Sequence, residues 1–144
     1  MDISFHLNQE LDTRLREVAW NLEEFGEDFS PDVRPAEPRF GDFQVNGILP
    51  YAKTRKTNPR QLGQKLLFAL QSSGHFPDEA VTIELAGPGF LNFSFTSAYL
   101  LRWIQQFRSR EVLQDSARSI QMDRNVVVDF SSPNTAKQMH VGHI

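Results

Sequence analysis

Two stretches of the chain carry strand-like patterns of different kinds, and together they limit the fold more than any other feature. In residues 81–95, the apolar residues of VTIEL and of LNFSF occupy every second position, and polar residues separate them. Alternation on both sides of a Gly-Pro-Gly turn predicts an antiparallel hairpin with one face in a core. Residues 126–130, VVVDF, do not alternate, which is typical of a parallel strand covered on both faces. The sequence therefore predicts two different folds in succession.

Helical spacing of apolar residues accounts for most of the rest. Residues 7–25 carry Leu, Val, Ala and Phe at three- and four-residue intervals and predict a helix that stops at Gly26. Residues 58–74 open with Asn-Pro and close with Gly, which are start and stop signals of a helix. A further helix is predicted from residue 97, fraying into the linker-like stretch RSREVLQDSARS. Its inward residues are expected to be Leu100, Ile104 and Phe107.

The segment FGDFQVNGILPYAK, residues 40–53, permits two interpretations. Apolar residues between 45 and 52 have helical spacing, and Asp42 could cap such a helix. Pro50 opposes a helix that begins so early, because it lacks an N–H and clashes with the preceding turn. The helix then begins near Gly47 or is kinked. If the front of the segment is extended instead, Phe43 and Val45 share a face and belong to the core.

These patterns divide the chain into three parts. Residues 1–112 are predicted to form an α+β domain in which helices pack on a small, mostly antiparallel sheet. Residues 113–125 are predicted to be a linker. Residues 126–144 have the strand, loop and helix start that open a Rossmann-type α/β domain, here truncated. An exposed apolar strand is unstable alone, so we expect residues 126–130 to be disordered, paired with another copy or docked on the first domain.

Composition adds the expectation of a soluble, cytoplasmic protein. The 144 residues include no Cys, which excludes disulfides and favours a reducing compartment. The first residues lack the basic and apolar regions of a secretory signal, and no stretch approaches the ~18 consecutive apolar residues of a membrane span. We therefore expect no membrane association.

The net charge of −3 hides an asymmetry along the chain. Residues 1–50 carry four Lys or Arg against eleven Asp or Glu, a net of −7, whereas residues 51–144 carry eleven against seven, a net of +4. A local basic strip can face phosphates while the remaining surface stays acidic. A solvated turn between helices explains the same cluster equally well. The clustered basic residues are Lys53, Arg55, Lys56, Arg60 and Lys65.

The stretch SSPNTAKQMHVGH, residues 131–143, has the residue types of a phosphate-binding loop. A loop that enters a helix N-terminus offers free N–H groups and a partial positive charge to phosphates. His140 and His143 are three residues apart, so both can turn toward one ligand on a nascent helix. Lys137 supplies a point charge, and Gly142, without a Cβ, allows a flat ring to approach the backbone. Two His could instead bind a metal, but the chain has no Cys and no third ligand nearby, so we expect no metal site.

This stretch resembles the signature of arginyl-tRNA synthetases, class I aminoacyl-tRNA synthetases whose ATP-binding element reads His-Ile/Val-Gly-His. The stretches FGDFQVNG, NPRQLGQKLL and IELAGPGFLNFSF resemble successive blocks of the same family's N-terminal additional domain, in the same order and spacing. The resemblance covers almost the whole chain. The signature comprises Pro133, Asn134, Thr135, Ala136, Lys137, Gln138, Met139, His140, Val141, Gly142 and His143, with Ser132 before it.

The resemblance implies an arginine–tRNA ligase as the parent protein. Such an enzyme forms arginyl-adenylate from L-arginine and ATP, which enters with Mg²⁺, and then esterifies the terminal adenosine of its tRNA. By the family's pattern, His140 and His143 hydrogen-bond ATP, and Lys137 faces the α-phosphate. Ser132 and Asn134 are implied to orient the ammonium and carboxylate of arginine. No tightly bound cofactor is implied.

The resemblance also implies that residues 1–112 dock on the elbow of the arginine tRNA and recognise a nucleotide of its D-loop. Phe43 would stack on a splayed base, unless it belongs to the core. Gln44 and Asn46 would hydrogen-bond base edges. The residues expected to contact the tRNA backbone are Lys53, Arg55, Lys56 and Arg60.

The expected activity belongs to the parent and not to these 144 residues. Activation in this family generally requires bound tRNA, and the parent is expected to be monomeric. The fragment alone is expected to be inactive, because an incomplete set of positioned groups loses most of the effective molarity of the reaction. The alternative is a stand-alone, non-catalytic RNA-binding module derived from a synthetase. The downstream reading frame distinguishes the two.

Overall fold

The computed structural model describes residues 4–121 and residue 127. The predicted strand at residues 126–130, apart from Val127, and the signature at residues 132–143 therefore lie outside the described residues. The elements are α1 (Leu7–Ala19), β1 (Val33–Pro35), the 3-10 turn η1 (Pro38–Phe40), β2 (Phe43–Val45), α2 (Ile48–Arg55), α3 (Pro59–Ser72), β3 (Val81–Ala86), β4 (Phe90–Phe95), α4 (Ser97–Gln106) and α5 (Arg110–Gln121).

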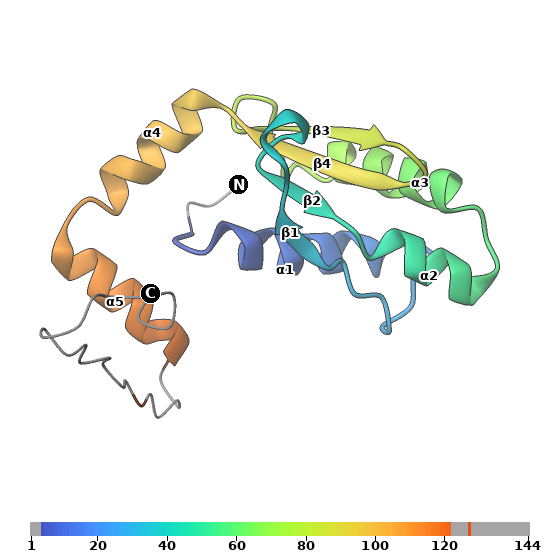
Figure 1. Ribbon diagram of the computed structural model, residues 1–144, viewed down its shortest axis with the longest axis horizontal. Helices are drawn as coiled ribbons and strands as arrows, with labels where there is room; N and C mark the ends of the chain where they lie inside the picture. Colours follow the sequence, from blue (N-terminus) through green and yellow to red (C-terminus); the bar gives the residue numbers. More distant parts are fainter. Residues whose placement is uncertain (1–3, 122–126, 128–144) are drawn as a thin grey trace, which may run out of the picture.

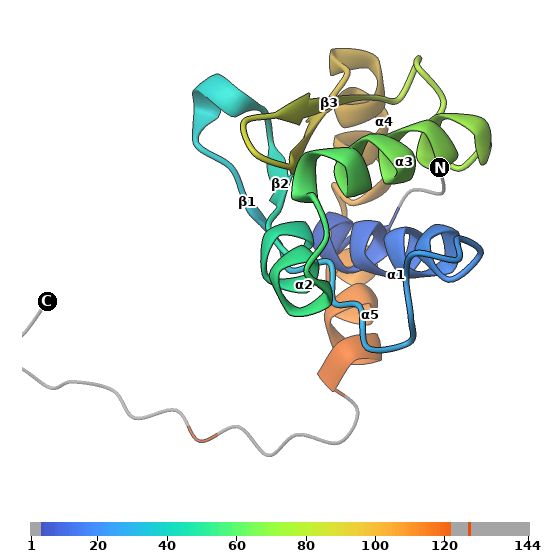
Figure 2. The ribbon, with the colours of Figure 1, turned by 90° about the vertical axis from the view of Figure 1, so that its right-hand side faces the viewer.

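The four strands form one sheet in the order β1-β2-β4-β3, and every neighbouring pair is antiparallel. The predicted hairpin is confirmed: β3 and β4 pair from Val81 with Phe95 to Ala86 with Phe90. Helices α1 and α3 lie on the same side of this sheet (Figure 1, Figure 2). The predicted α+β class, with helices on a small antiparallel sheet, is confirmed.

The core lies between the helix-covered face of the sheet and the two long helices. Phe93, in the central strand β4, is fully buried and meets the ring of Phe76 edge-on, with 5.7 Å between centroids. Leu11 and Leu15 of α1 and the leucines of the α3 stripe are also buried. Of these, Leu11, Leu15, Leu66 and Leu70 are fully buried, as are Val45 and Leu91 in the sheet.

Helix α1 is shorter than predicted, because it ends at Ala19 and not at Phe25. Two tight turns follow, in which Leu22 N–H donates to Ala19 O and Phe25 N–H donates to Leu22 O. These turns keep the apolar spacing without a helix. Phe25 leaves the helix axis to pack on Phe29, 4.6 Å between ring centroids, so tertiary packing overrides the helical pattern.

The ambiguous segment divides into a strand and a helix. Val45 belongs to β2, so the helix does not include it, and α2 begins at Ile48 after Gly47. Pro50 is tolerated because it lies in the first turn, where the backbone N–H would have no partner within the helix. Asp42 does not cap this helix. Its Oδ2 accepts the Phe95 N–H at 2.7 Å, so the residue that precedes β2 is hydrogen-bonded to β4.

Helix α3 begins as the sequence predicts. The Asn58 side chain accepts the N–H groups of Arg60 and Gln61 at 3.0 and 3.2 Å. Pro59 takes the first helical position, where no N–H is needed. This cap fixes the direction of the helix that covers β3 and β4.

The C-terminal part differs from the prediction in two ways. Ile104 is 55% exposed and does not face inward, whereas Phe107 is buried and Leu100 packs against the core. Residues 110–121 form a helix in place of the predicted fraying. Ser109 Oγ accepts the Val112 N–H at 3.3 Å, and the stretch contains no Gly or Pro, so a capped helix is favoured over a coil. In the part of the chain that the structure describes, none of the helices has the length and apolar character that a membrane span requires.

Candidate RNA-binding face

The face of the sheet opposite α1 and α3 carries one polar residue from each strand in a continuous row. Arg34 pairs with Gln44, Gln44 with Asn92, and Asn92 with Glu84. Side chains alternate between faces along a strand, so these four point away from the buried Val45 and Leu91. We call the row, together with Phe90 and Ser94 of β4, the open face.

An amide pair occupies the centre of the open face. Gln44 Nε2 donates to Asn92 Oδ1 at 2.8 Å. Asn92 is only 6% exposed and is fixed by this bond, whereas Gln44 remains partly exposed. A Gln held in this way has its amide oxygen and its second N–H available for a ligand. The pair therefore presents an oriented donor and acceptor above the sheet.

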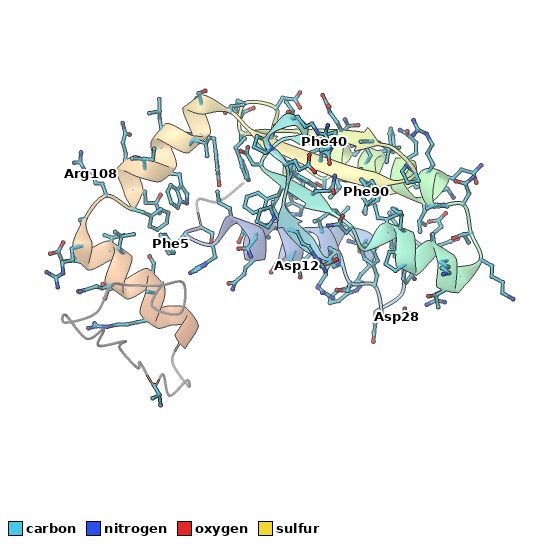
Figure 3. The ribbon with its side chains drawn as sticks, viewed as in Figure 1. Phe5, Asp12, Asp28, Phe40, Phe90 and Arg108 are labelled. Atoms are coloured by element: carbon cyan, nitrogen blue, oxygen red, sulfur yellow. The ribbon has the colours of Figure 1, made fainter. Side chains whose placement is uncertain are left out.

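The η1 turn forms one edge of the open face. An added Cβ at Gly41 would lie 2.5 Å from Ser94 Oγ, and Gly41 has φ +111°, so this loop approaches β4 as only glycine allows. Phe40 beside it is 42% exposed, and the Arg39 guanidinium lies 4.6 Å from the Phe40 ring centroid. Figure 3 labels Phe40 at this turn and Phe90 at the start of β4.

Two of the predicted RNA contacts lie elsewhere. Phe43 is on the helix-covered side, where its ring meets Phe95 edge-on at 6.1 Å and packs against the core. This is the core position that the extended interpretation of the segment predicts. Asn46 lies beyond the end of β2, and its Nδ2 donates to Asp32 O at 3.5 Å. Of the three predicted base contacts, only Gln44 lies on the open face.

Three members of the basic cluster are engaged within the protein. Arg55 Nη2 bonds Asp28 Oδ1 at 2.7 Å, and its guanidinium lies 5.2 Å from the Tyr51 ring centroid. The hydrogen bond and charge of Asp28 hold the pKa of Arg55 above its usual value. Arg60 Nη1 donates to Gly87 O in the hairpin turn. Lys65 pairs with Glu24.

The remaining two members are free to bind an anion. Lys53 and Lys56 are exposed at the end of α2, and within the described part of the chain their ammonium groups have no hydrogen bond or ion pair. Of the predicted backbone contacts, these two lysines have ammonium groups that remain available for a phosphate. No group of three or more His, Asp or Glu that could hold a metal lies among the described residues.

The sequence patterns do not single out Phe40, Phe90 and Asn92 as candidate contacts. The alternation of β4 puts Asn92 and Phe90 on the polar side, so that signal is present in the sequence. Their proximity to Gln44 depends on the pairing of β2 with β4, which the predicted hairpin does not include. The exposed Phe40 ring and the half-buried Phe90 ring, together with oriented amides on a sheet, suit stacking and hydrogen bonding of unpaired bases.

Two family models match the chain in sequence. The model described as arginyl tRNA synthetase N terminal domain matches residues 3–95, and the model of the class I (R) tRNA synthetase catalytic domain matches residues 104–144. An arginine–tRNA ligase from Laribacter hongkongensis is 43% identical over 121 residues, which cover 81% of this chain and 20% of the relative. One from Prochlorococcus marinus is 37% identical over an alignment of 148 positions, which covers 96% of this chain and 24% of the relative.

A solved structure shares the fold. The crystal structure of arginyl-tRNA synthetase from Plasmodium falciparum superposes with a TM-score of 0.55 at 14% sequence identity, covering 77% of this chain and 20% of that one. An α+β domain followed by the start of a class I catalytic domain defines part of an aminoacyl-tRNA synthetase. The chain belongs to the arginyl-tRNA synthetase family. It spans about a fifth to a quarter of the length of the Laribacter and Prochlorococcus relatives.

Proposed function

We propose that this chain is the N-terminal part of an arginine–tRNA ligase, which activates arginine with ATP and transfers it to the terminal adenosine of its tRNA. The observation that carries the proposal is the succession of two matching models in the family's order, N-terminal domain and then catalytic domain, along one chain. The signature from Pro133 to His143 falls within the catalytic match. His140, His143 and Lys137 are its proposed ATP contacts, and Ser132 and Asn134 its proposed arginine contacts.

Formation of the adenylate requires the signature to position ATP and to neutralise its negative charge, and it requires no nucleophile from the protein. Attack of the arginine carboxylate on the α-phosphate releases pyrophosphate, and the phosphate oxygens carry negative charge throughout. A Lys and two His aimed at those oxygens stabilise the charge where it develops. The remaining groups of the site would come from the part of the enzyme that follows residue 144 in the relatives.

For the N-terminal domain we propose that the open face recognises an unpaired base of the tRNA elbow. Gln44 provides the base-edge contact, because the Asn92 bond orients its amide. Phe40, exposed at the edge, provides the stacking surface in place of the packed Phe43. Lys53 and Lys56 provide phosphate contacts.

The activity is tested with the complete polypeptide encoded by the reading frame that contains these residues. Arginine-dependent exchange of pyrophosphate into ATP is expected when the cognate tRNA is present, and the 144-residue chain alone is expected to show none. Lys137→Ala in the complete polypeptide should lower the exchange rate by about a hundredfold or more, as for removal of other preorganised charge-stabilising groups. A reading frame that stops after Ile144 would support the non-catalytic module instead.

The proposed base contact and the proposed phosphate contacts can be distinguished by how tRNA binding depends on salt concentration. Gln44→Ala should weaken binding of the cognate tRNA by about 1–3 kcal/mol and abolish discrimination against a tRNA with an altered D-loop. The double variant Lys53→Ala/Lys56→Ala should weaken both tRNAs alike and reduce the slope of log K against log salt by about one unit per lysine. Filter-binding titrations of the chain at several salt concentrations measure both effects.

The thermal midpoint of each variant provides the control for folding, since Gln44 also bonds Asn92. If the unmodified chain binds the cognate tRNA and the tRNA with an altered D-loop equally at every salt concentration, the proposed base contact is wrong. A Gln44→Ala chain that keeps its discrimination would assign the contact to another residue.

A further inference from the structure

Asn46 and Gly47 form the only Asn-Gly pair in the sequence, and this pair joins β2 to α2. An Asn followed by Gly is especially prone to deamidation, because glycine has no side chain to hinder attack of its backbone nitrogen on the Asn side chain. Deamidation converts the neutral Asn amide into a carboxylate. The pair is therefore a candidate modification site at the junction of the two elements that carry Gln44, Lys53 and Lys56.

The reaction proceeds through a cyclic imide. The Gly47 nitrogen loses its proton to hydroxide and bonds to Cγ of Asn46, and the Cγ–Nδ2 bond breaks as ammonia leaves. Water then opens the ring at either carbonyl, which gives aspartate or its β-linked isomer isoaspartate, with no oxidation or reduction. Because the imide nitrogen carries no hydrogen, the ring can close only after the Gly47 N–H has left any hydrogen bond that it makes.

In the folded chain, hydrogen bonds hold both reacting groups. Gly47 N–H donates to Pro31 O at 2.8 Å. Asn46 donates to Asp32 O through its backbone N–H at 3.2 Å and through its Nδ2 at 3.5 Å. Gly47 is buried, so water does not replace the lost bond unless the local structure opens. Ring closure therefore requires that the segment carrying Pro31 and Asp32 first moves away from the pair.

Residues 29–32, which we call the covering loop, lie directly against the pair. A Cβ added to Gly47 would lie 1.8 Å from Ser30 O, which shows how closely the two backbones pack. Arg16 of α1 holds this loop in place, because its Nη1 donates to Phe29 O at 3.0 Å and its Nη2 to Ser30 Oγ at 3.2 Å. Release of Arg16 would loosen the loop where it covers Gly47.

We propose that Asn46 is a deamidation site and that opening of the covering loop sets its rate. Local opening of a folded chain takes microseconds to seconds, and imide formation is far slower. The loop therefore opens and closes many times before one ring closes. Under these conditions the rate of modification follows the fraction of molecules in which the loop is open.

Either product would disrupt the junction of β2 and α2. Isoaspartate adds one backbone atom between the two elements, which moves the Gly47 N–H away from Pro31 O. Aspartate replaces the Nδ2 donor with a carboxylate that faces the Asp32 carbonyl oxygen, so an attractive contact becomes a repulsive one. Both changes would misdirect Gln44 and the lysines at the end of α2 and so weaken tRNA binding. This consequence rests on the proposed function, whereas the modification itself does not.

Peptide mapping by mass spectrometry tests the proposal. The 144-residue chain and a synthetic peptide of residues 42–51 are incubated at the same mildly alkaline pH, and conversion at Asn46 is followed with time. We expect conversion in the chain to be slower than in the peptide by a factor of at least about 30, because the peptide has no covering loop. Conversion at equal rates would overturn the proposal, as would faster conversion at another Asn of the chain.

Two variants test the role of the covering loop. Arg16→Ala should raise the rate in the chain by about tenfold, because it removes two charge-assisted hydrogen bonds to the loop. The rate should stay below that of the peptide, because Phe29 and Pro31 remain buried. Ser30→Ala removes only one of the two bonds, so its effect should be smaller. Its altered side chain is exposed, so this variant keeps the test valid if Arg16→Ala does not fold.

Arg14→Ala is the matched control, because Arg14 lies on the same helix and its ion pairs with Glu10 and Glu17 are within α1. Its rate should equal that of the unmodified chain, and the thermal midpoint of each variant shows whether it is folded. If Arg14→Ala raises the rate as much as Arg16→Ala, or if neither Arg16→Ala nor Ser30→Ala raises it, the loop does not control the reaction and the proposal is wrong.

The deamidated chain is then separated by ion exchange, and its binding to the cognate tRNA is compared with that of the unmodified chain. We expect the isoaspartate form to bind more weakly. Equal tRNA binding together with loop-dependent rates would support the modification site and count against the proposed RNA-binding role of the junction. Loop-independent rates would refute the modification proposal and leave the proposed function untouched.

Discussion

Phe93→Ala is expected to lower the free energy of unfolding by about 3–5 kcal/mol, the range for removal of a fully buried aromatic side chain. Phe93 is 0% exposed and lies in β4, between β2 and β3, so strands fix the backbone on both sides. The surrounding side chains cannot close the cavity without moving that backbone. A domain of this size is typically stable by only about 5–15 kcal/mol, so the loss is a large fraction of the total.

Urea unfolding of the 144-residue chain measures this effect, and Phe68→Ala is its control. Phe68 is the same residue type but 70% exposed on α3, so its truncation should change the free energy of unfolding by less than about 0.5 kcal/mol. A similar change in both variants would mean that the core does not enclose Phe93. The slope of the free energy against urea should stay constant if both variants unfold in one step.

The parts of the fold that the sequence predicts are those specified by local chemistry. Asn58 and Pro59 begin α3 because a side-chain oxygen and a fixed φ suffice to start a helix. The β3–β4 hairpin follows from alternation within two strands of six residues each. Neither feature needs information from distant parts of the chain.

The parts that the sequence does not predict depend on partners far away in the chain. β1 and β2 have three residues each, which is too few for a pattern of alternating apolar and polar residues to be recognised in the sequence. They form because β2 pairs with the edge of β4 that β3 leaves unpaired. Ile104 follows the helical spacing of Leu100 and Phe107, but no described part of the domain covers the side of α4 on which it lies, so its side chain is exposed. Periodicity shows which residues are apolar and does not show which body covers them.

The candidate site is predictable to a similar extent. Gln44 is a predicted contact and lies on the open face, while Phe43, one residue earlier, points to the opposite side as strand geometry requires. The partner of Gln44 is Asn92, 48 positions away. Only the register of β2 against β4 brings them together, and no local pattern contains that register.

Gly47→Ala is expected to destabilise the chain by about 3 kcal/mol, at the upper end of the typical cost of overpacking. A Cβ at this position would lie 1.8 Å from Ser30 O and 2.8 Å from the Pro31 carbonyl carbon, although φ −65° suits any residue. Arg16 holds the opposing loop through Phe29 O at 3.0 Å, and Gly47 N–H donates to Pro31 O at 2.8 Å. The loop therefore cannot withdraw without losing these bonds.

Gly74→Ala separates this steric effect from backbone strain. Gly74 has φ +72° and no atom within 4 Å of an added Cβ, so alanine there costs only the left-handed conformation, about 1 kcal/mol. Urea unfolding should therefore rank Gly47→Ala well below Gly74→Ala in stability. The reverse order would show that the Ser30–Pro31 loop yields to the methyl group. In that case the junction of β2 and α2, which sets the direction of Gln44 and of the lysines at the end of α2, is not as rigid as a base-recognising surface requires.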